Sequence, residues 1–238
     1  MFAYVDEPPR GLELLVVEDE PRLRELLVRR FTLEGHRVTA VADGTSAIDR
    51  AGSDHFDILL LDVALGPGPS GFDVCRTLRA RHNVIPIIML TGLGSEADAV
   101  QGLEAGADDF VTKPVGMAEL RSRVRAVLRR TGQRSGDEDV QTVGDVTIDT
   151  GQRTVKVRGE PARLTFSEFE LLSCLMAPPR RVFNREELLK AIWGDADYRD
   201  PRAIDVHIRH MREKLEEHPN DPQVILTVRG AGYRVADD

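Results

Sequence analysis

The chain contains only two cysteines among its 238 residues, Cys75 and Cys174. Both lie in apolar patterns typical of helices, so we expect two small core residues and neither a disulfide nor a cysteine metal site. No apolar run approaches the roughly 18 residues that a membrane span needs. The first ten residues lack the basic flank and apolar segment of a signal peptide. We therefore expect a cytoplasmic protein that contacts no membrane.

The sequence also lacks an excess of positive charge. Its net charge is −8, and residues 139–238 carry 15 Lys and Arg against 18 Asp and Glu. Because nucleic acids are polyanions, the overall charge does not favour binding to DNA or RNA. Any contact with a nucleic acid must come from a local basic surface.

Internal repeats and long low-complexity segments are missing as well, and the residue pattern divides the chain into two domains. Over residues 12–130, five short apolar runs are each followed by an amphipathic stretch. This pattern predicts an α/β, flavodoxin-like, doubly wound domain of five parallel strands and five helices. Residues 1–11 are predicted to be an N-terminal extension. Residues 131–139, TGQRSGDED, have no apolar side chain and are predicted to be a flexible linker.

Residues 140–238 show a different pattern, typical of an α+β domain. Alternating apolar and polar residues come first and predict short antiparallel strands. Three helical patterns follow, after Thr165, Asn184 and Pro201, and the first two open with the sequence of a capping box. The stretch VILTVRGAGYRVA near the end of the chain predicts a β-hairpin that turns at its glycines.

Acidic and polar residues stand at the predicted C-terminal ends of the parallel strands. Glu18 and Asp19 follow the first run, Asp62 ends the third, Thr91 ends the fourth and Lys113 follows the fifth. Because these strand ends meet at one edge of the sheet, three carboxylates would converge there and repel one another. A hard divalent cation such as Mg²⁺ removes that repulsion. Asp62 can then act as a nucleophile toward phosphorus, although a lone Asp after a strand is also typical of a turn or a helix cap.

The segments LLVVEDE, ILLLDV, IIMLTG and GADDFVTKPV together resemble the receiver domain of bacterial two-component response regulators. The resemblance implies that a sensor histidine kinase phosphorylates Asp62 and that Lys113 contacts the phosphoryl group. It implies that Thr91 and Phe110 are switch residues. The implied Mg²⁺ ligands are the side chains of Glu18, Asp19 and Asp62 and the backbone carbonyl of Ala64.

By the same resemblance, phosphorylated chains form a homodimer through the fourth helix, fifth strand and fifth helix of the receiver. Four residues fit the charged pattern of that face: Glu104, Asp109, Glu119 and Arg123. These side chains are also typical of a solvated helix face. The sequence departs from the family pattern at DVALGPGPSG, residues 62–71, where the loop after Asp62 carries one extra residue before Gly71.

The third helical pattern of the second domain, RAIDVHIRHMREKL, has two distinct faces. Its apolar stripe at helical spacing consists of Ile204, Ile208, Met211 and Leu215. Val206 lies on the opposite, polar face, where the methyl group of a thymine in a major groove would be a suitable partner. Arg202 and Arg209 on that face suit phosphates or guanine edges. A mixed-charge amphipathic helix is otherwise an ordinary surface helix.

The segments LTFSEFELLSCL, NREELLKAIWG, RAIDVHIRHMREKL and TVRGAGYRV, in this order, resemble the winged helix-turn-helix output domain of the OmpR/PhoB class. The resemblance implies that the helix at 202–216 enters the major groove of double-stranded promoter DNA and that Arg229 approaches the minor groove. The implied DNA-contacting residues are Arg185, Trp193, Arg202, Ala203, Val206, His207, Arg209, His210, Arg212, Thr227, Arg229 and Tyr233. His210 replaces an Arg common in the class. Because a neutral imidazole cannot bind guanine as Arg does, we expect a different DNA sequence preference.

The sequence therefore predicts a regulator that is phosphorylated on Asp62, dimerises, binds promoter DNA and works with RNA polymerase. It is not predicted to be an enzyme, because the receiver catalyses only its own phosphoryl transfer and dephosphorylation. A haloacid-dehalogenase-like phosphohydrolase would need a second Asp two residues after the nucleophile, where this chain has Ala64. The remaining alternative is an atypical receiver that binds DNA without phosphorylation.

Overall fold

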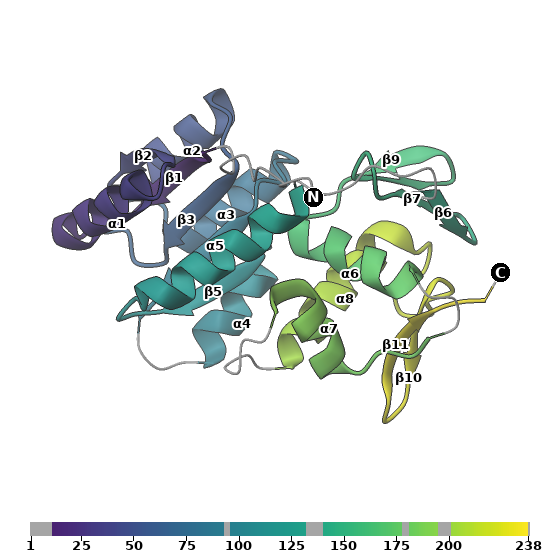
Figure 1. Cartoon of the computed structure of the whole chain (residues 1–238). Helices are drawn as coiled ribbons and strands as arrows, with labels where there is room; N and C mark the ends of the chain where they lie inside the picture. Colours follow the sequence, from purple (N-terminus) through teal and green to yellow (C-terminus); the bar gives the residue numbers. More distant parts are fainter. Residues whose placement is uncertain (1–10, 93–95, 132–139, 178–180, 195–200, 238) are drawn as a thin grey trace, which may run out of the picture.

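The computed structural model of the chain describes residues 11–92, 96–131, 140–177, 181–194 and 201–237. The first domain contains a five-stranded parallel sheet in the order β2-β1-β3-β4-β5, with a helix after each strand (Figure 1). Its elements are β1 (Glu13–Val17), α1 (Pro21–Leu33), β2 (Arg37–Val41), α2 (Gly44–Ser53), β3 (Ile58–Asp62), α3 (Gly71–Ala80), β4 (Ile87–Thr91), α4 (Glu96–Glu104), β5 (Asp109–Thr112) and α5 (Met117–Thr131).

Both faces of this sheet are buried. Along β1, Leu14 and Val16 pack in one cluster with α1 and α5, whereas Leu15 and Val17 pack in a second cluster with α2 and α3. Because successive side chains of a strand point to opposite faces, a strand covered on both sides must be apolar at every position. The predicted doubly wound sheet of five parallel strands is therefore confirmed.

The second domain begins with a four-stranded antiparallel sheet in the order β6-β7-β8-β9, continues with three helices and ends with a two-stranded hairpin. We call this hairpin, β10 and β11, the wing. The elements are β6 (Val140–Val143), β7 (Val146–Asp149), β8 (Thr154–Val157), β9 (Glu160–Ala162), α6 (Phe166–Met176), α7 (Arg185–Trp193), α8 (Arg202–Leu215), β10 (Ile225–Val228) and β11 (Gly232–Val235).

The helix signals read from the sequence are present in the structure. Thr165 and Asn184 form the two predicted capping boxes at the starts of α6 and α7. The predicted apolar stripe of α8 is buried along its whole length. Cys75 and Cys174 are free thiols, the first fully buried and the second half-buried against the core of the second domain. Their assignment as separate core residues is confirmed.

The predicted boundaries are matched only in part. Thr131, predicted to begin the linker, is instead the last residue of α5, because the helix continues three residues beyond Leu128, the last apolar residue of its pattern. The other linker residues, 132–139, and residues 1–10 of the predicted extension lie outside the described part of the chain. No described helix is long and apolar enough to cross a membrane.

The two domains pack against each other through α4 and α8 and through α5 and α7 (Figure 1). Leu103 of α4 belongs to the hydrophobic cluster of the second domain, and Phe110 of β5 packs against it. In return, Phe166 of α6 belongs to a cluster of the first domain.

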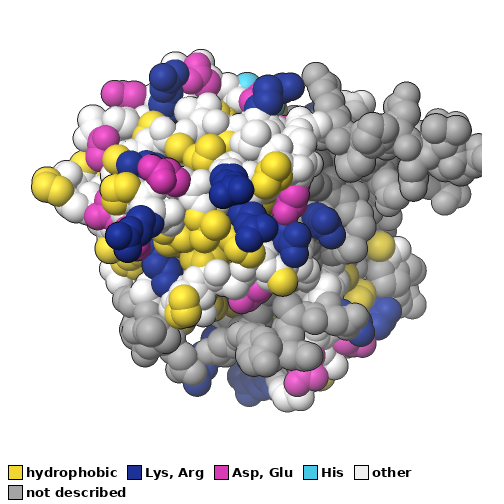
Figure 2. Space-filling model, turned by 60° about the vertical axis from the view of Figure 1, so that its left-hand side comes forward, with side chains coloured by type: hydrophobic (Ala, Val, Ile, Leu, Met, Phe, Trp, Pro, Cys, Tyr) yellow, Lys and Arg dark blue, Asp and Glu magenta, His cyan; other side chains and the backbone are white. Residues whose placement is uncertain are grey.

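The side of the molecule that is turned forward in Figure 2 shows hydrophobic patches beside Lys and Arg side chains. Among the described residues, Leu26 and Leu33 of α1 are exposed large hydrophobic side chains.

The cap of α7 offers a direct test of the fold. Asn184→Ala removes the side-chain oxygen that accepts a hydrogen bond from Glu187 N at 2.8 Å. Loss of such a cap costs about 1 kcal/mol, so we expect calorimetry to show a lower melting temperature for the second domain, by about 4 °C. Asn184→Ser retains an acceptor and should melt near the wild-type temperature. Equal melting temperatures for the wild type and Asn184→Ala would contradict the assigned role of this cap.

Candidate functional site

Three carboxylates meet at the C-terminal edge of the parallel sheet. Glu18 and Asp19 directly follow β1, and Asp62 ends β3. One oxygen from each side chain lies within 4.8 Å of the oxygens of the other two. Glu18 and Asp62 are buried, whereas Asp19 is exposed. The prediction that these side chains converge is confirmed.

Lys113 offsets part of the negative charge of this cluster. Its Nζ lies 2.8 Å from Asp62 Oδ2, 2.9 Å from Glu18 Oε2 and 3.0 Å from Glu18 Oε1. Burial lowers the pKa of Lys113, but its hydrogen bonds to Asp62 and Glu18 outweigh burial and raise it overall. Burial also raises the pKa of Glu18, with the hydrogen bond from Lys113 opposing it and the charge of Asp62 adding to it. The ammonium group thus holds two like-charged side chains together.

The donor atoms of this cluster suit a hard divalent cation. Glu18 Oε2 is buried and accepts no hydrogen bond, although it forms an ion pair with Lys113. Carboxylate oxygens from three side chains are the ligands that Mg²⁺ prefers. The side chains that would hold it are those of Glu18, Asp19 and Asp62. Ala64 is exposed two residues after Asp62, and the role of its carbonyl stays a prediction.

The loop after Asp62 runs beside the acidic cluster. Gly66 has a φ of +51°, and a Cβ placed there would lie 3.6 Å from Asp19 Oδ2. At the end of the loop, a Cβ on Gly71 would lie only 2.1 Å from the carbonyl oxygen of Asp62, so only glycine fits. The loop with its extra residue therefore passes close to the Asp19 side chain and to the backbone of Asp62.

The two predicted switch residues lie on the strands next to Asp62. Thr91 is buried at the end of β4, and its carbonyl accepts a hydrogen bond from Lys113 N at 2.6 Å. Phe110 is half-buried on β5 and packs against the clusters of both domains. The Lys113–Pro114 peptide bond is cis. The structure thus brings the predicted catalytic residues together and extends the site toward the second domain through Phe110.

The residues predicted to contact DNA differ in exposure. Four are exposed: Arg202, Arg209, Thr227 and Arg229. Three are half-buried: Arg185, His210 and Arg212. Five are buried: Trp193, Ala203, Val206, His207 and Tyr233. Their contacts with DNA stay predictions.

Val206 requires a correction. We expected it on the polar, exposed face of α8, but it is only 8% exposed. It belongs to the same hydrophobic cluster as Leu103 of α4, because α4 packs on α8. His207, one residue further on, is also buried, with its ring centroid 5.6 Å from that of Trp193. Burial lowers the pKa of His207 to about 3, so its ring is neutral at pH 7.

Two arginines predicted at the DNA backbone already have partners within the second domain. Arg212 donates hydrogen bonds to the carbonyl oxygen of Ile225, at 2.7 and 3.0 Å, and to Thr227 Oγ1 at 2.8 Å. Arg185 Nε lies 2.7 Å from Asp205 Oδ1, which also accepts a hydrogen bond from the hydroxyl of Tyr233. These contacts fasten the wing to α7 and α8.

The four residues of the predicted dimer face are engaged within the chain. Glu104 forms an ion pair with Arg209 of α8. Arg123 is buried and donates to both carboxylate oxygens of Asp109, at 3.0 and 3.1 Å, and it also pairs with Glu119. Burial raises the pKa of Asp109 to about 7, with the charge of Arg123 opposing this effect. Dimerisation stays a prediction.

Sequence reasoning missed a contact between Asp108 and Ser167, which joins the two domains. The local signal was an acid directly before a buried strand. Its partner lies 59 residues further along the chain. Nothing in the sequence links these two positions.

Comparisons with known proteins identify the family. Residues 14–125 match the response regulator receiver domain, and residues 159–235 match the family described as transcriptional regulatory protein, C terminal. The chain is 46% identical over 226 residues to the sensory transduction protein RegX3 of Mycolicibacterium smegmatis, a match that covers 93% of this chain and 98% of RegX3. This chain belongs to the two-component response regulators of the OmpR/PhoB type.

Other relatives agree with this assignment. The DNA-binding response regulator MtrA of the same organism is 44% identical over 221 residues, which cover 93% of this chain and 95% of MtrA. The response regulator therefore consists of a receiver and an effector domain that binds DNA, and its function is transcription regulation, as predicted. The alternative of a regulator that works without phosphorylation is not favoured.

Solved structures of similar proteins differ in how well the placement of their two domains matches this chain. A mutant of the protein RitR has a TM-score of 0.76 and 29% identity, with 96% of this chain and 100% of that chain covered. DrrB, an OmpR/PhoB homologue of Thermotoga maritima, reaches only 0.50 with 31% identity and 95% and 99% coverage. A high score over both domains requires a similar placement of one against the other. The placement of the two domains in this response regulator therefore resembles that in the RitR mutant more than that in DrrB.

Lys113 gives a testable consequence for metal binding. Lys113→Met removes the ammonium group that lies between Glu18 and Asp62. Because this cation opposes the entry of a second one, we expect Mg²⁺ to bind roughly tenfold more tightly in calorimetric titrations at constant ionic strength. Lys156→Met, at an exposed lysine of the effector domain, is the matched control and should bind Mg²⁺ as the wild type does. Unchanged or weaker binding in Lys113→Met would show that the ammonium does not compete with the metal.

Proposed function

We propose that a sensor histidine kinase transfers a phosphoryl group to Asp62 and that this transfer controls the binding of α8 to promoter DNA. The observation that supports the proposal most directly is the convergence of Glu18, Asp19 and Asp62 around Lys113 at the C-terminal edge of the sheet. In open parallel sheets, ligands bind at this edge.

The chemistry follows from the groups at the site. A carboxylate oxygen of Asp62 attacks phosphorus, the bond between phosphorus and the donor nitrogen of the kinase breaks, and an acyl phosphate forms. In this proposal Lys113 neutralises negative charge on the phosphoryl oxygens, and the Thr91 hydroxyl donates a hydrogen bond to them. Mg²⁺, when bound, neutralises the charge that the phosphoryl group brings to the carboxylates. The receiver catalyses only this transfer and the later hydrolysis of its own phosphate.

The effector domain provides the output. We propose that phosphorylated chains form homodimers in the cytoplasm, which place two copies of α8 on tandem half-sites and act on RNA polymerase. Linking two modules raises their effective concentration, so a weak single contact suffices. The exposed Arg202, Arg209 and Arg229 supply local positive charge in a domain without a net basic surplus.

Phosphorylation of Asp62 is tested by intact mass spectrometry. After incubation with a small phosphodonor and Mg²⁺, the wild type should gain the mass of one phosphoryl group, and Asp62→Asn should gain none. Asp49→Asn, at an exposed aspartate of α2, is the control and should behave as the wild type does. Equal gains in the wild type and Asp62→Asn, or no gain in either, would reject Asp62 as the phosphoacceptor.

The DNA preference is tested at His210. His210→Arg restores a side chain able to form two hydrogen bonds with one guanine, worth about 1–3 kcal/mol of discrimination. We expect selection from a random DNA pool to show at least one base position in each half-site that shifts toward G. His218→Arg, an exposed histidine of the same domain, adds the same charge and should leave the selected sequence unchanged. An identical selected motif for the wild type and His210→Arg would exclude a base contact at this position.

A further inference from the structure

Asp108 connects the receiver to the effector domain. It lies directly before β5, at the edge of the sheet opposite Asp62, and is 1% exposed. Its Oδ2 accepts hydrogen bonds from Arg79 Nη2 and Ile87 N, both at 2.9 Å. Its Oδ1 accepts one from Ser167 N at 2.8 Å, and its backbone carbonyl accepts one from Ser167 Oγ at 3.0 Å. Two hydrogen bonds between the domains therefore converge on one buried residue.

This contact completes the start of an effector helix. The first backbone N–H groups of any helix have no partner within it. At α6, the capping box of Thr165 and Glu168 satisfies the N–H groups of those two residues. Ser167 is the second residue of the helix, and its N–H is satisfied by Asp108 of the other domain. The negative charge of Asp108 also favours this position, because a helix N-terminus carries partial positive charge.

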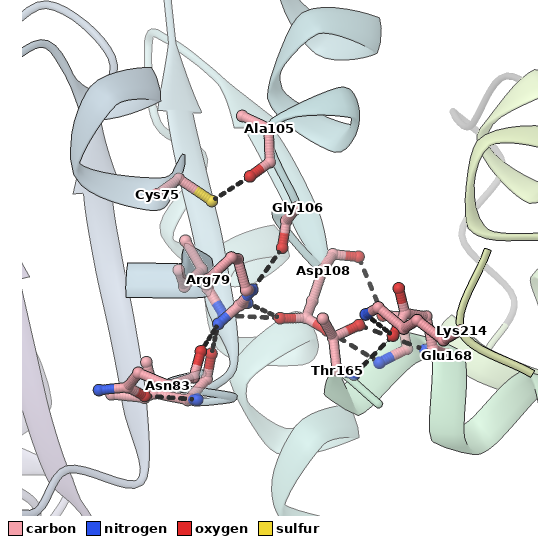
Figure 3. Close-up of polar contacts among 12 residues, drawn as sticks. Cys75, Arg79, Asn83, Ala105, Gly106, Asp108, Thr165, Glu168 and Lys214 are labelled. Carbon is pink, nitrogen blue, oxygen red and sulfur yellow. Dashed lines mark hydrogen bonds and ion pairs between the residues drawn. The ribbon is translucent and has the colours of Figure 1, made fainter. Parts of the chain in front are cut away.

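Polar contacts also join this group of side chains to α8, the helix that is proposed to bind DNA. Glu168 is 1% exposed, and its Oε2 accepts a hydrogen bond from Lys214 Nζ of α8 at 2.5 Å (Figure 3). A line of polar contacts thus runs from Arg79 on α3 through Asp108 and α6 to Lys214. It fixes α8 relative to the receiver.

A second contact covers the polar face of α8 itself. Glu104, the last residue of α4, forms an ion pair with Arg209 and lies 3.9 Å from His210 Nε2. Leu103, one residue earlier, belongs to the hydrophobic cluster that contains Ala203 and Val206. Residues of α8 that would face a DNA groove therefore face the receiver instead.

We propose that Asp108 is a positioning residue that holds the response regulator closed, with the DNA-reading face of α8 turned against α4. The proposal rests on the proposed function, since it takes α8 as the helix that binds DNA. A major groove, about 12 Å wide, must admit that whole face of the helix. The receiver and the DNA duplex compete for this face of α8, because the Arg209 guanidinium forms an ion pair with Glu104 and would have to leave it to bind DNA. Breaking the contact between Asp108 and Ser167 releases α8.

Ser167→Asp tests the proposal in the unphosphorylated full chain. In the closed arrangement, the new carboxylate would be buried against that of Asp108. In an open arrangement, an acid in the first turn of α6 is favourable, so the helix itself should remain stable. Small-angle X-ray scattering should therefore give a larger radius of gyration than for the wild type. DNA affinity at constant salt should rise about tenfold or more, because apparent affinity scales with the fraction of open molecules.

Thr45→Asp is the matched control. It introduces the same acid at the second residue of α2, an exposed position. We expect it to keep the compact scattering profile and the DNA affinity of the wild type. If Ser167→Asp does not fold, as judged by circular dichroism, Ser167→Ala replaces it. That variant removes one of the two hydrogen bonds to Asp108 and should raise DNA affinity about threefold.

Scattering separates a failure of this proposal from a failure of the proposed function. If folded Ser167→Asp stays as compact as the wild type, Asp108 does not hold the domains together and the proposal is wrong. If it expands while its DNA affinity stays at the wild-type value, the contact does not control access to α8 and the proposal is also wrong. If it expands, and neither it nor the phosphorylated wild type binds any DNA in a selection experiment, Asp108 does hold the two domains together and the proposed function is wrong.

Discussion

The ammonium group of Lys113, within 3.0 Å of oxygens from both Glu18 and Asp62, makes the contacts on which the acidic cluster at the edge of the sheet depends. Parallel strands deliver their C-terminal residues to one edge of the sheet, so the fold that makes the site also forces its carboxylates together. Burial makes their repulsion stronger, because charges interact more strongly away from water. Lys113 offsets this repulsion from the end of β5, and a metal ion is suited to share that role.

The segment from Asp108 to Lys113 serves both ends of the receiver. Asp108 binds the effector domain, Asp109 binds Arg123, Phe110 packs against both domains, and Lys113 binds Asp62. The two residues that flank this short strand are therefore the acid that contacts the effector domain and the cation of the acidic cluster. A movement of β5 along its own axis would change the geometry of both.

Three arginines of the effector domain that are predicted to contact DNA have partners within the chain in this arrangement. Arg212 fastens the wing to α8, Arg185 binds Asp205, and Arg209 pairs with Glu104 of the receiver. Charged side chains on a DNA-binding surface repel one another when no nucleic acid is present. Carboxylates pair with Arg185 and Arg209, and carbonyl and hydroxyl oxygens accept hydrogen bonds from Arg212, so contacts within the chain offset this repulsion. The contacts with phosphates predicted for these residues would have to replace these partners.

The sequence alone determined the order of strands and helices, because runs buried on both faces, capping boxes and helical stripes are local patterns that depend on neighbours a few residues away. It also placed Glu18, Asp19, Asp62 and Lys113 at one site, since parallel strands make the ends of distant segments adjacent without any further information. Only the tertiary structure decided that Val206 is buried, that Glu104 pairs with Arg209 and that Asp108 caps α6. Each of these depends on how one domain packs on the other, and no spacing in the sequence records which surfaces meet.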